Sequence, residues 1–287
     1  MTIITDERCT GYHAPGHPER PLRIRATLER LRGQSDLSLT WAEPGDVTEA
    51  ELLRAHTRAH LERLLEPRDF DLDTAWFPDI AEHARRSAAA ALTASRRALQ
   101  GERTFSLMRP PGHHATRNRA MGFCYLNNAA IAALAARAEG VDRVAVFDFD
   151  VHHGNGTEDI LLDQPGTLYV SVHQHPCYPG TGTEHRGTNC RNYPMPPATP
   201  ADEYRRALEQ AIDDIRRFQP GLLIVSAGFD AYVRDPLARE TLEVEDFHWL
   251  GRMIRSLNCP TASLLEGGYS RDLPELIFAY LKGLHDL

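Results

Sequence analysis

Lysine is almost absent from this sequence of 287 residues, where it occurs only as Lys282. A mechanism in which a lysine amine forms a Schiff base is therefore not expected. Long apolar runs are lacking too, since no stretch approaches the roughly 18 residues of a membrane-spanning helix. The charged N-terminus, MTIITDERC, has no apolar core of a signal peptide. These absences predict a soluble, cytoplasmic protein without a membrane partner.

Cysteine is also scarce. The five cysteines form no Cys-x-x-Cys pair, and their odd number fits reduced thiols better than a disulfide framework. Acidic residues outnumber basic ones, which gives a formal net charge of −8. A negative charge of this size argues against direct binding to nucleic acid or to anionic membranes.

Short runs of β-branched and apolar residues recur along the chain. They are unbroken rather than alternating, which is typical of a parallel sheet covered on both faces. These predicted strands are 2–5, 104–108, 143–149, 167–173, 221–228 and 260–268. Helical patterns lie between them, at 21–32, from the capping box at 48–51, and at 78–100, 127–138 and 199–218. The alternation predicts an α/β doubly wound sheet in one domain spanning residues 1–287.

Polar residues cluster directly after the predicted strands. The clusters read RPPGHHA, DVHHGNG, HQHPCYPGTG, FDAY and GGY. Open α/β sheets bind their ligands outside the carboxyl ends of the strands. We therefore expect five loops to meet in a single site.

The segment DFDVHHGNGTE, at 148–158, concentrates charge at the end of one predicted strand. If this strand stays extended, Asp148, Asp150 and His152 point to one side. Asp150 and His152 are then candidate metal ligands, and Asp230, after another strand, is a candidate third. Three such ligands with an open position for water are typical of a catalytic zinc site. The alternative is a hydrogen-bonded Asp–His cluster that caps the strand ends.

The loop RPPGHHA adds two adjacent histidines, His113 and His114. They are candidates for a general base and acid, with Asp148 and Asn155 as partners that would fix their tautomers. Two ordinary loop histidines are the alternative. The hydroxyl of Tyr269, on a glycine turn, is able to donate to a developing oxyanion, although a tyrosine is more often a packed aromatic.

Aromatic residues lie on loops of the same predicted edge. Phe123 and Tyr178 are candidates for the walls of a narrow channel, with ordinary core packing as the alternative. Three other histidines lie on predicted helices, where we expect them to be surface or core residues without a role in the site. They are His56, His60 and His83.

Eight ordered motifs resemble the zinc-dependent histone deacetylase superfamily, which also contains bacterial deacetylase-like amidohydrolases and acetylpolyamine amidohydrolases. They are RPPGHHA, GFCYLNNAA, DFDVHHGNGTE, SVHQ, YPGTG, SAGFDA, DPLA and LEGGY, running from Arg109 to Tyr269. HPERP, at 17–21, extends the similarity to the N-terminus. The resemblance implies the arginase–deacetylase fold, a largely parallel central sheet flanked by helices with the site at the carboxyl ends of the strands.

The resemblance implies a role for each matching residue. One zinc ion per chain is expected at Asp150, His152 and Asp230. The resemblance also implies that His113 and His114 are catalytic histidines, with Asp148 and Asn155 as their partners, and that Tyr269 polarises the substrate carbonyl. Residues implied to contact the substrate are Gly122, through its backbone acceptor, the tunnel aromatics Phe123 and Tyr178, and the gate residue Leu237. A structural potassium ion is implied at carbonyls of Asp148, Asp150 and His152, together with Ser171 and Val172.

Three positions differ in informative ways among the family's branches. Asparagine at 155 resembles the class II branch, because the class I branch has aspartate. Tyr178 stands where phenylalanine is more usual. Tyr232 stands where many bacterial relatives have histidine, and nothing in the sequence explains this difference.

The implied activity is zinc-dependent hydrolysis that removes acetyl or another short acyl group from acyl-lysine in proteins or peptides. The closest alternative is an acetylpolyamine amidohydrolase. Two features favour acyl-lysine. The span between HPERP and RPPGHHA is short and leaves little room for the long loop insertion of bacterial polyamine enzymes, and the apolar Leu237 cannot pair with a second cationic nitrogen. The net charge of −8 instead favours a polycationic substrate. An arginase-like ureohydrolase would need a second carboxylate-rich motif, and a non-catalytic binder would be expected to have lost Tyr269 or a histidine. The natural target, the acyl length and the oligomeric state stay open.

Overall fold

The computed structural model describes residues 1–285, and eight of its strands form a single sheet. The strand order is β2-β1-β3-β8-β7-β4-β5-β6, and every neighbouring pair is parallel. The strands are β1 (Thr2–Ile4), β2 (Thr40–Ala42), β3 (Thr104–Ser106), β4 (Val144–Asp148), β5 (Thr167–Gln174), β6 (Cys190–Met195), β7 (Leu222–Ala227) and β8 (Thr261–Leu265). The predicted α/β sheet is confirmed.

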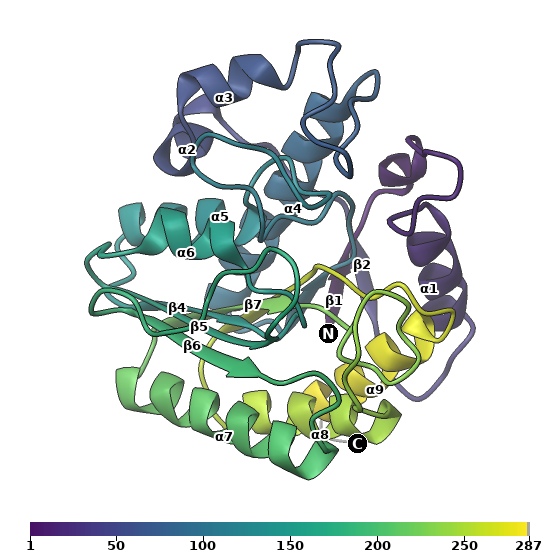
Figure 1. Cartoon of the computed structure of the whole chain (residues 1–287), viewed down its shortest axis with the longest axis vertical. Helices are drawn as coiled ribbons and strands as arrows, with labels where there is room; N and C mark the ends of the chain where they lie inside the picture. The colour runs from purple at the N-terminus through teal and green to yellow at the C-terminus, as the bar shows by residue number, and fades with distance from the viewer. Residues whose placement is uncertain (286–287) are drawn as a thin grey trace.

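Helices cover both faces of the sheet (Figure 1), with α5 and α6 on one side and α7, α8 and α9 on the other. Their bounds are α1 (Leu22–Arg32), α2 (Glu49–Ala55), α3 (Arg58–Arg63), α4 (Ile80–Leu99), α5 (Asn128–Ala138), α6 (Asn155–Leu161), α7 (Ala201–Phe218), α8 (Val244–Arg255) and α9 (Leu273–His285), with a 3₁₀ turn η1 at Glu7–Thr10. This cover explains the unbroken apolar runs of β4, β5 and β7, whose residues are all buried. No helix within residues 1–285 is long and apolar enough to cross a bilayer.

Local sequence explains how two of the helices form. Thr48 accepts a hydrogen bond from the amide of Glu51, and the Glu51 side chain accepts one from the amide of Thr48, which completes the expected capping box of α2. Alanine fills the buried face of α4, where its small side chain allows close packing against the sheet and α5. Alanine also has the highest helix propensity of all residues.

The sequence predicted neither the two edge strands nor the last two helices. Strand β2 has only three residues, and β6 contains Pro194, which is tolerated because β6 is an edge strand. Helix α9 is buried along most of its length, so its apolar sequence shows no amphipathic pattern. Strand β4 ends at Asp148, so the expected extended continuation to residue 152 is wrong; residues 150–152 form a bend instead.

Candidate active site

A cavity of about 380 Å³ lies among the loops that follow the strands of the sheet. It brings together residues from seven segments far apart in the sequence. Those singled out from the sequence are His114, Gly122, Phe123, His152, Tyr178, Leu237 and Tyr269. His17 and Pro18, from the HPERP motif, also line it, although the sequence indicated no role for them, and so does Asp73, which the sequence did not single out. The convergence expected for an open α/β sheet is therefore present.

Asp150, His152 and Asp230 form one buried cluster of possible metal ligands. Nδ1 of His152 lies 3.1 Å from Oδ1 of Asp150 and 3.1 Å from Oδ2 of Asp230. The neighbouring parallel strands β4 and β7 place them together, because Asp150 follows β4 and Asp230 follows β7. Donor atoms about 3 Å apart suit a single ion with bonds of roughly 2.0–2.2 Å.

The surroundings of this cluster also fit a cation. Two carboxylates in a buried site repel each other unless a positive charge compensates them. Burial alone would raise the pKa of Asp150, but His113 and His152 lower it below its usual range. A Cβ atom at Gly267 would lie 2.1 Å from Oδ2 of Asp230, so glycine is required for the carboxylate to sit there.

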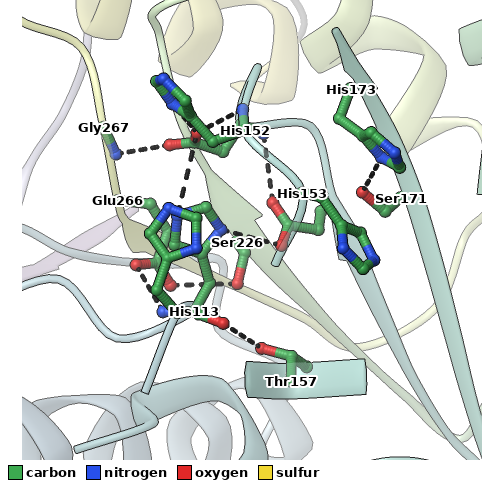
Figure 2. Close-up of polar contacts among 12 residues, drawn as sticks. His113, His152, His153, Thr157, Ser171, His173, Ser226, Glu266 and Gly267 are labelled. Atoms are coloured by element: carbon green, nitrogen blue, oxygen red, sulfur yellow. Dashed lines mark hydrogen bonds and ion pairs between the residues drawn. The ribbon is translucent and has the colours of Figure 1, made fainter. Parts of the chain in front are cut away.

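Backbone amides orient both carboxylates. The amide of Gly267 donates to Oδ2 of Asp150 at 2.7 Å (Figure 2). The amide of Val151 donates to Oδ1 of Asp230 at 2.9 Å. Oδ1 of Asp150 also accepts from the amide of His152 at 2.9 Å. Each carboxylate is therefore held by the main chain and has one oxygen facing Nδ1 of His152.

The tandem histidines lie side by side, with ring centroids 4.0 Å apart. Nδ1 of His113 is 3.1 Å from Oδ2 of Asp148, and Nδ1 of His114 is 2.8 Å from Oδ1 of Asn155. Since the carboxylate and the amide oxygen are acceptors, each ring carries a proton on Nδ1. Nε2 of His113 points to the metal-ligand cluster, 3.8 Å from Oδ1 of Asp150.

The two rings differ in protonation. Burial lowers the pKa of His113, but the charges of Asp150 and Asp148 outweigh this and raise it to about 10. Burial, together with the charges of His113 and His152, moves the pKa of His114 well below its usual value. The pKa values of the two rings therefore shift in opposite directions, as expected for a pair that divides acid and base roles.

Tyr269 stands at the other side of the cavity. Its ring contacts Phe123 edge-on, with centroids 5.8 Å apart, and the guanidinium of Arg23 lies 4.9 Å from its centroid. Desolvation of the hydroxyl raises the pKa of Tyr269 well above its usual value. The phenol therefore remains a hydrogen-bond donor at neutral pH.

The rim and walls of the cavity are mainly aromatic and apolar. The ring of Tyr178 contacts His114 edge-on, with centroids 5.0 Å apart. A Cβ atom at Gly122 would lie 2.5 Å from Cδ2 of His114, so this position requires glycine. The side chains of Tyr178 and Leu237 remain more than one-third exposed, at the entrance.

Some of the residues implied for a structural cation lie on the neighbouring strands β4 and β5. Asp148 on β4 pairs with Ser171 on the neighbouring β5. The hydroxyl of Ser171 lies 2.8 Å from Nδ1 of His173 (Figure 2), and the carbonyl of Val172 accepts from the hydroxyl of Tyr204 at 3.4 Å. These contacts are all between protein groups, so the structural cation stays a prediction of the sequence.

Glu266 is a site residue that the sequence did not reveal. Its Oε2 accepts hydrogen bonds from the amides of Gly112 (2.7 Å) and His113 (3.2 Å), and its Oε1 accepts one from Ser226 at 3.0 Å (Figure 2). The side chain is fully buried. An acid at the end of a predicted buried strand was the available signal, because such a residue requires partners.

His56 is a second missed residue, since it is a buried support rather than a residue without a role. Its Nδ1 donates to the carbonyl of Thr116 at 3.0 Å, and its Nε2 accepts from the amide of Asn127 at 2.9 Å. The Asn127 side chain in turn donates to the carbonyl of Ala115 at 3.0 Å. His56 therefore braces the loop that carries the tandem histidines. No sequence signal marked it, because its partners are backbone groups.

Known proteins resemble this chain over nearly its whole length. A probable deacetylase of Methanothermobacter thermautotrophicus is 40% identical over 300 residues, which cover 99% of this chain and 90% of the relative. A histone deacetylase-like amidohydrolase of Pseudomonas aeruginosa is 38% identical over 282 residues, or 90% of this chain and 73% of the relative. The crystal structure of an acetylpolyamine aminohydrolase from Burkholderia pseudomallei has a TM-score of 0.91 and 29% identity, and the match covers 100% of this chain and 99% of that one.

The histone deacetylase domain family matches residues 17–282, a range that includes the cavity residues, both histidines and all three candidate ligands. The arginase–deacetylase fold implied by the motifs is thereby confirmed. Together with the deacetylase and amidohydrolase relatives, this match makes the protein a hydrolase of the deacetylase and amidohydrolase type, and the chain belongs to the histone deacetylase family.

Proposed function

We propose that the protein is a zinc-dependent amidohydrolase that removes acetyl or another short acyl group from acyl-lysine side chains of proteins or peptides. The observation that carries this proposal is the position of the Asp150–His152–Asp230 cluster beside the tandem histidines, whose Nδ1 atoms are held by Asp148 and Asn155, in one narrow cavity. Bound by these three residues, zinc would supply Lewis-acid polarisation of the amide carbonyl and a water of lowered pKa.

The side chains around the cluster stabilise the oxyanion and transfer the proton. The hydroxyl of Tyr269 donates a hydrogen bond to the carbonyl oxygen as negative charge develops there. His114, neutral at Nε2, takes a proton from the attacking water and returns it to the nitrogen of the leaving amine. His113, oriented by Asp148 at Nδ1, directs Nε2 towards the metal-ligand cluster and supports the developing oxyanion electrostatically. The amide C–N bond breaks to give a carboxylic acid and a free amine.

The cavity entrance favours a slim, uncharged stem. Phe123 and Tyr178 wall the path, and Leu237 lies at the rim. Aromatic and aliphatic surfaces suit the methylene chain of lysine, and an apolar gate selects no second cationic nitrogen by charge pairing. The potassium ion at Asp148 and Ser171 and the cytoplasmic location stay predictions of the sequence.

Hydrolysis of acetylpolyamines is the second candidate, and a specific observation favours it. Asp73 lines the cavity and is exposed, so a carboxylate lies near the path of a cationic substrate. The net charge of −8 acts in the same direction. The similar Burkholderia structure is that of an acetylpolyamine aminohydrolase. General field effects are screened by salt, however, whereas the apolar walls act at any ionic strength.

Comparison of kcat/KM for an acetyl-lysine peptide and for acetylspermidine, at physiological ionic strength, tests the assignment. We expect the peptide to be preferred. A preference of tenfold or more for acetylspermidine, about 1.4 kcal/mol in transition-state discrimination, would replace acyl-lysine by acetylpolyamine as the substrate. Elemental analysis should find one equivalent of zinc per chain; two equivalents of a transition metal would favour the arginase-like alternative.

A further inference from the structure

The carboxylate of Asp235 is buried in the loop that follows Asp230. Its Oδ2 accepts hydrogen bonds from the amides of Tyr269 (2.7 Å) and Ser270 (3.1 Å). Its Oδ1 accepts one from the amide of Leu237 at 3.0 Å. A single side chain thus joins backbone groups of two loops that are 34 residues apart in the sequence.

The loop that carries Tyr269 needs such support. Gly267 and Gly268 precede the tyrosine, and Gly268 has a φ of +109°, which glycine adopts readily and other residues rarely do. Glycine gives the backbone conformational freedom, so the position of the phenol depends on the contacts that hold the following amides. The bond from Asp235 is made to the amide of Tyr269 itself.

The same carboxylate holds the entrance of the cavity. Leu237 lies at the rim, and its amide is bound by the oxygen of Asp235 that does not bind Tyr269. Movement of either loop therefore strains the hydrogen bonds of the other. Burial, together with the charge of Asp230, raises the pKa of the Asp235 carboxyl to about 7. In the ionised form its bonds are charge-assisted, and such bonds are shorter and about twice as strong as neutral ones.

We propose that Asp235 is a positioning residue for the reaction: it holds the amides of Tyr269 and Leu237 on one carboxylate, and so fixes the catalytic phenol relative to the tunnel rim. This inference rests on the proposed role of Tyr269 as the oxyanion donor. Within residues 1–285, the side chain of Asp235 does not line the cavity and makes no recorded hydrogen bond to a candidate metal ligand; its one recorded link to them is the charge of Asp230.

A second carboxylate offers a matched control. Asp272 accepts hydrogen bonds from the hydroxyl of Tyr232 (2.9 Å) and from Nε of Arg234 (3.1 Å). It therefore ties together the same two segments, but it does so away from the cavity and through side chains. Asp272→Asn tests general tethering of the loops, whereas Asp235→Asn tests the support of Tyr269.

The experiment compares kcat, KM and zinc content of the two variants. An asparagine at 235 has one acceptor oxygen and a donating amide, so it cannot accept from Leu237 on one side and from Tyr269 and Ser270 on the other. We expect kcat of Asp235→Asn to fall about 10- to 100-fold, the scale of a small misplacement of a catalytic group. KM and zinc content should change less than about twofold, because the lost interaction is made in the transition state. Asp272→Asn should keep kcat within about twofold.

A double-mutant cycle then separates the two proposals. If Asp235 acts through Tyr269, Asp235→Asn should cost less than about twofold in kcat when Tyr269 is already phenylalanine. An equal loss in both backgrounds would overturn the positioning role while leaving Tyr269 as the oxyanion donor. A Tyr269→Phe enzyme with normal kcat would overturn both assignments. Asp235→Ala, which removes all three bonds, should lose at least as much kcat as Asp235→Asn; normal activity in either folded variant rejects the inference.

Discussion

At the amino edge of the sheet, Arg97 and Glu102 form an ion pair (2.9 Å) whose side chains are about one-third exposed, and Thr2 donates to the same carboxylate. At the carboxyl edge, Asp150 and Asp230 are fully buried and lie beside His152. The amino edge also carries the larger cavity, about 630 Å³ against 380 Å³. The size of a cavity therefore does not identify the candidate active site. Buried carboxylates that need a compensating cation identify it instead.

The difference follows from the cost of burying charge. An exposed ion pair keeps most of its hydration and contributes little to stability. Buried carboxylates lose their hydration, so they persist only where hydrogen bonds and cations compensate them. The carboxyl edge supplies such bonds through Gly267 and Val151 and has room for a cation, whereas the amino edge neutralises its charges internally.

The largest expected effect is at the buried cluster. Asp230→Ala should lose both the metal and the activity, because Asp150 and His152 alone seldom hold zinc tightly. Elemental analysis and a deacetylation assay measure the two losses. Retention of a full equivalent of zinc by this variant would remove Asp230 from the ligand set.

Tyr269→Phe should come next. The fold and the bound zinc should be retained, while kcat falls by about 10²–10³, the usual loss for one oxyanion donor. Steady-state kinetics of the zinc-loaded parent and variant enzymes measure this loss of kcat. A phenylalanine variant with near-normal kcat would reduce Tyr269 to a packing role.

The carboxyl edge should also make stability sensitive to acid through His56. Burial lowers the pKa of His56 to about 3 in the folded protein, against an ordinary value near 6.5 in the unfolded chain. The unfolded chain therefore takes up the proton first, so this stability is present above about pH 6.5 and is lost as the pH falls towards 3. We expect about 2 kcal/mol of this contribution to be lost between pH 7 and 5.

Urea denaturation at both pH values, on the parent protein and on His56→Gln, measures this term. The variant should be less stable at pH 7, because its side chain replaces the two backbone contacts imperfectly. Its stability should nevertheless fall less on acidification than that of the parent. Parallel pH dependences in the two proteins would show that another group is responsible.

The smallest effect is expected at the amino edge. Glu102→Gln removes the charge that faces Arg97 but keeps an acceptor for Thr2. Its free energy of unfolding should change by less than about 1 kcal/mol, and kcat should not change. A large loss of activity in this variant would contradict the contrast between the two edges.

The sequence predicted the central strands well, and the residues that it singled out as ligands lie together in the structure. Unbroken apolar runs marked β4, β5 and β7, and the charges that follow β4 and β7 marked the candidate ligands. Edge strands and buried helices were harder, because β6 contains a proline and α9 has no polar face. Asp148, Asp150 and His152 do lie at one site, but the backbone bends after β4 instead of remaining extended.

By itself, the sequence determined which chemical groups are present and in which loops they lie, because apolar runs and strand ends are local features. Only the tertiary structure decided how those groups act on one another. The pKa of His113 depends on its burial and on Asp150 and Asp148, and that of His114 on its burial and on His113. The supports of the site, Glu266, His56 and Asp235, bind backbone amides and carbonyls. Every residue has those groups, so no side-chain pattern in the sequence identifies the partner that folding will select.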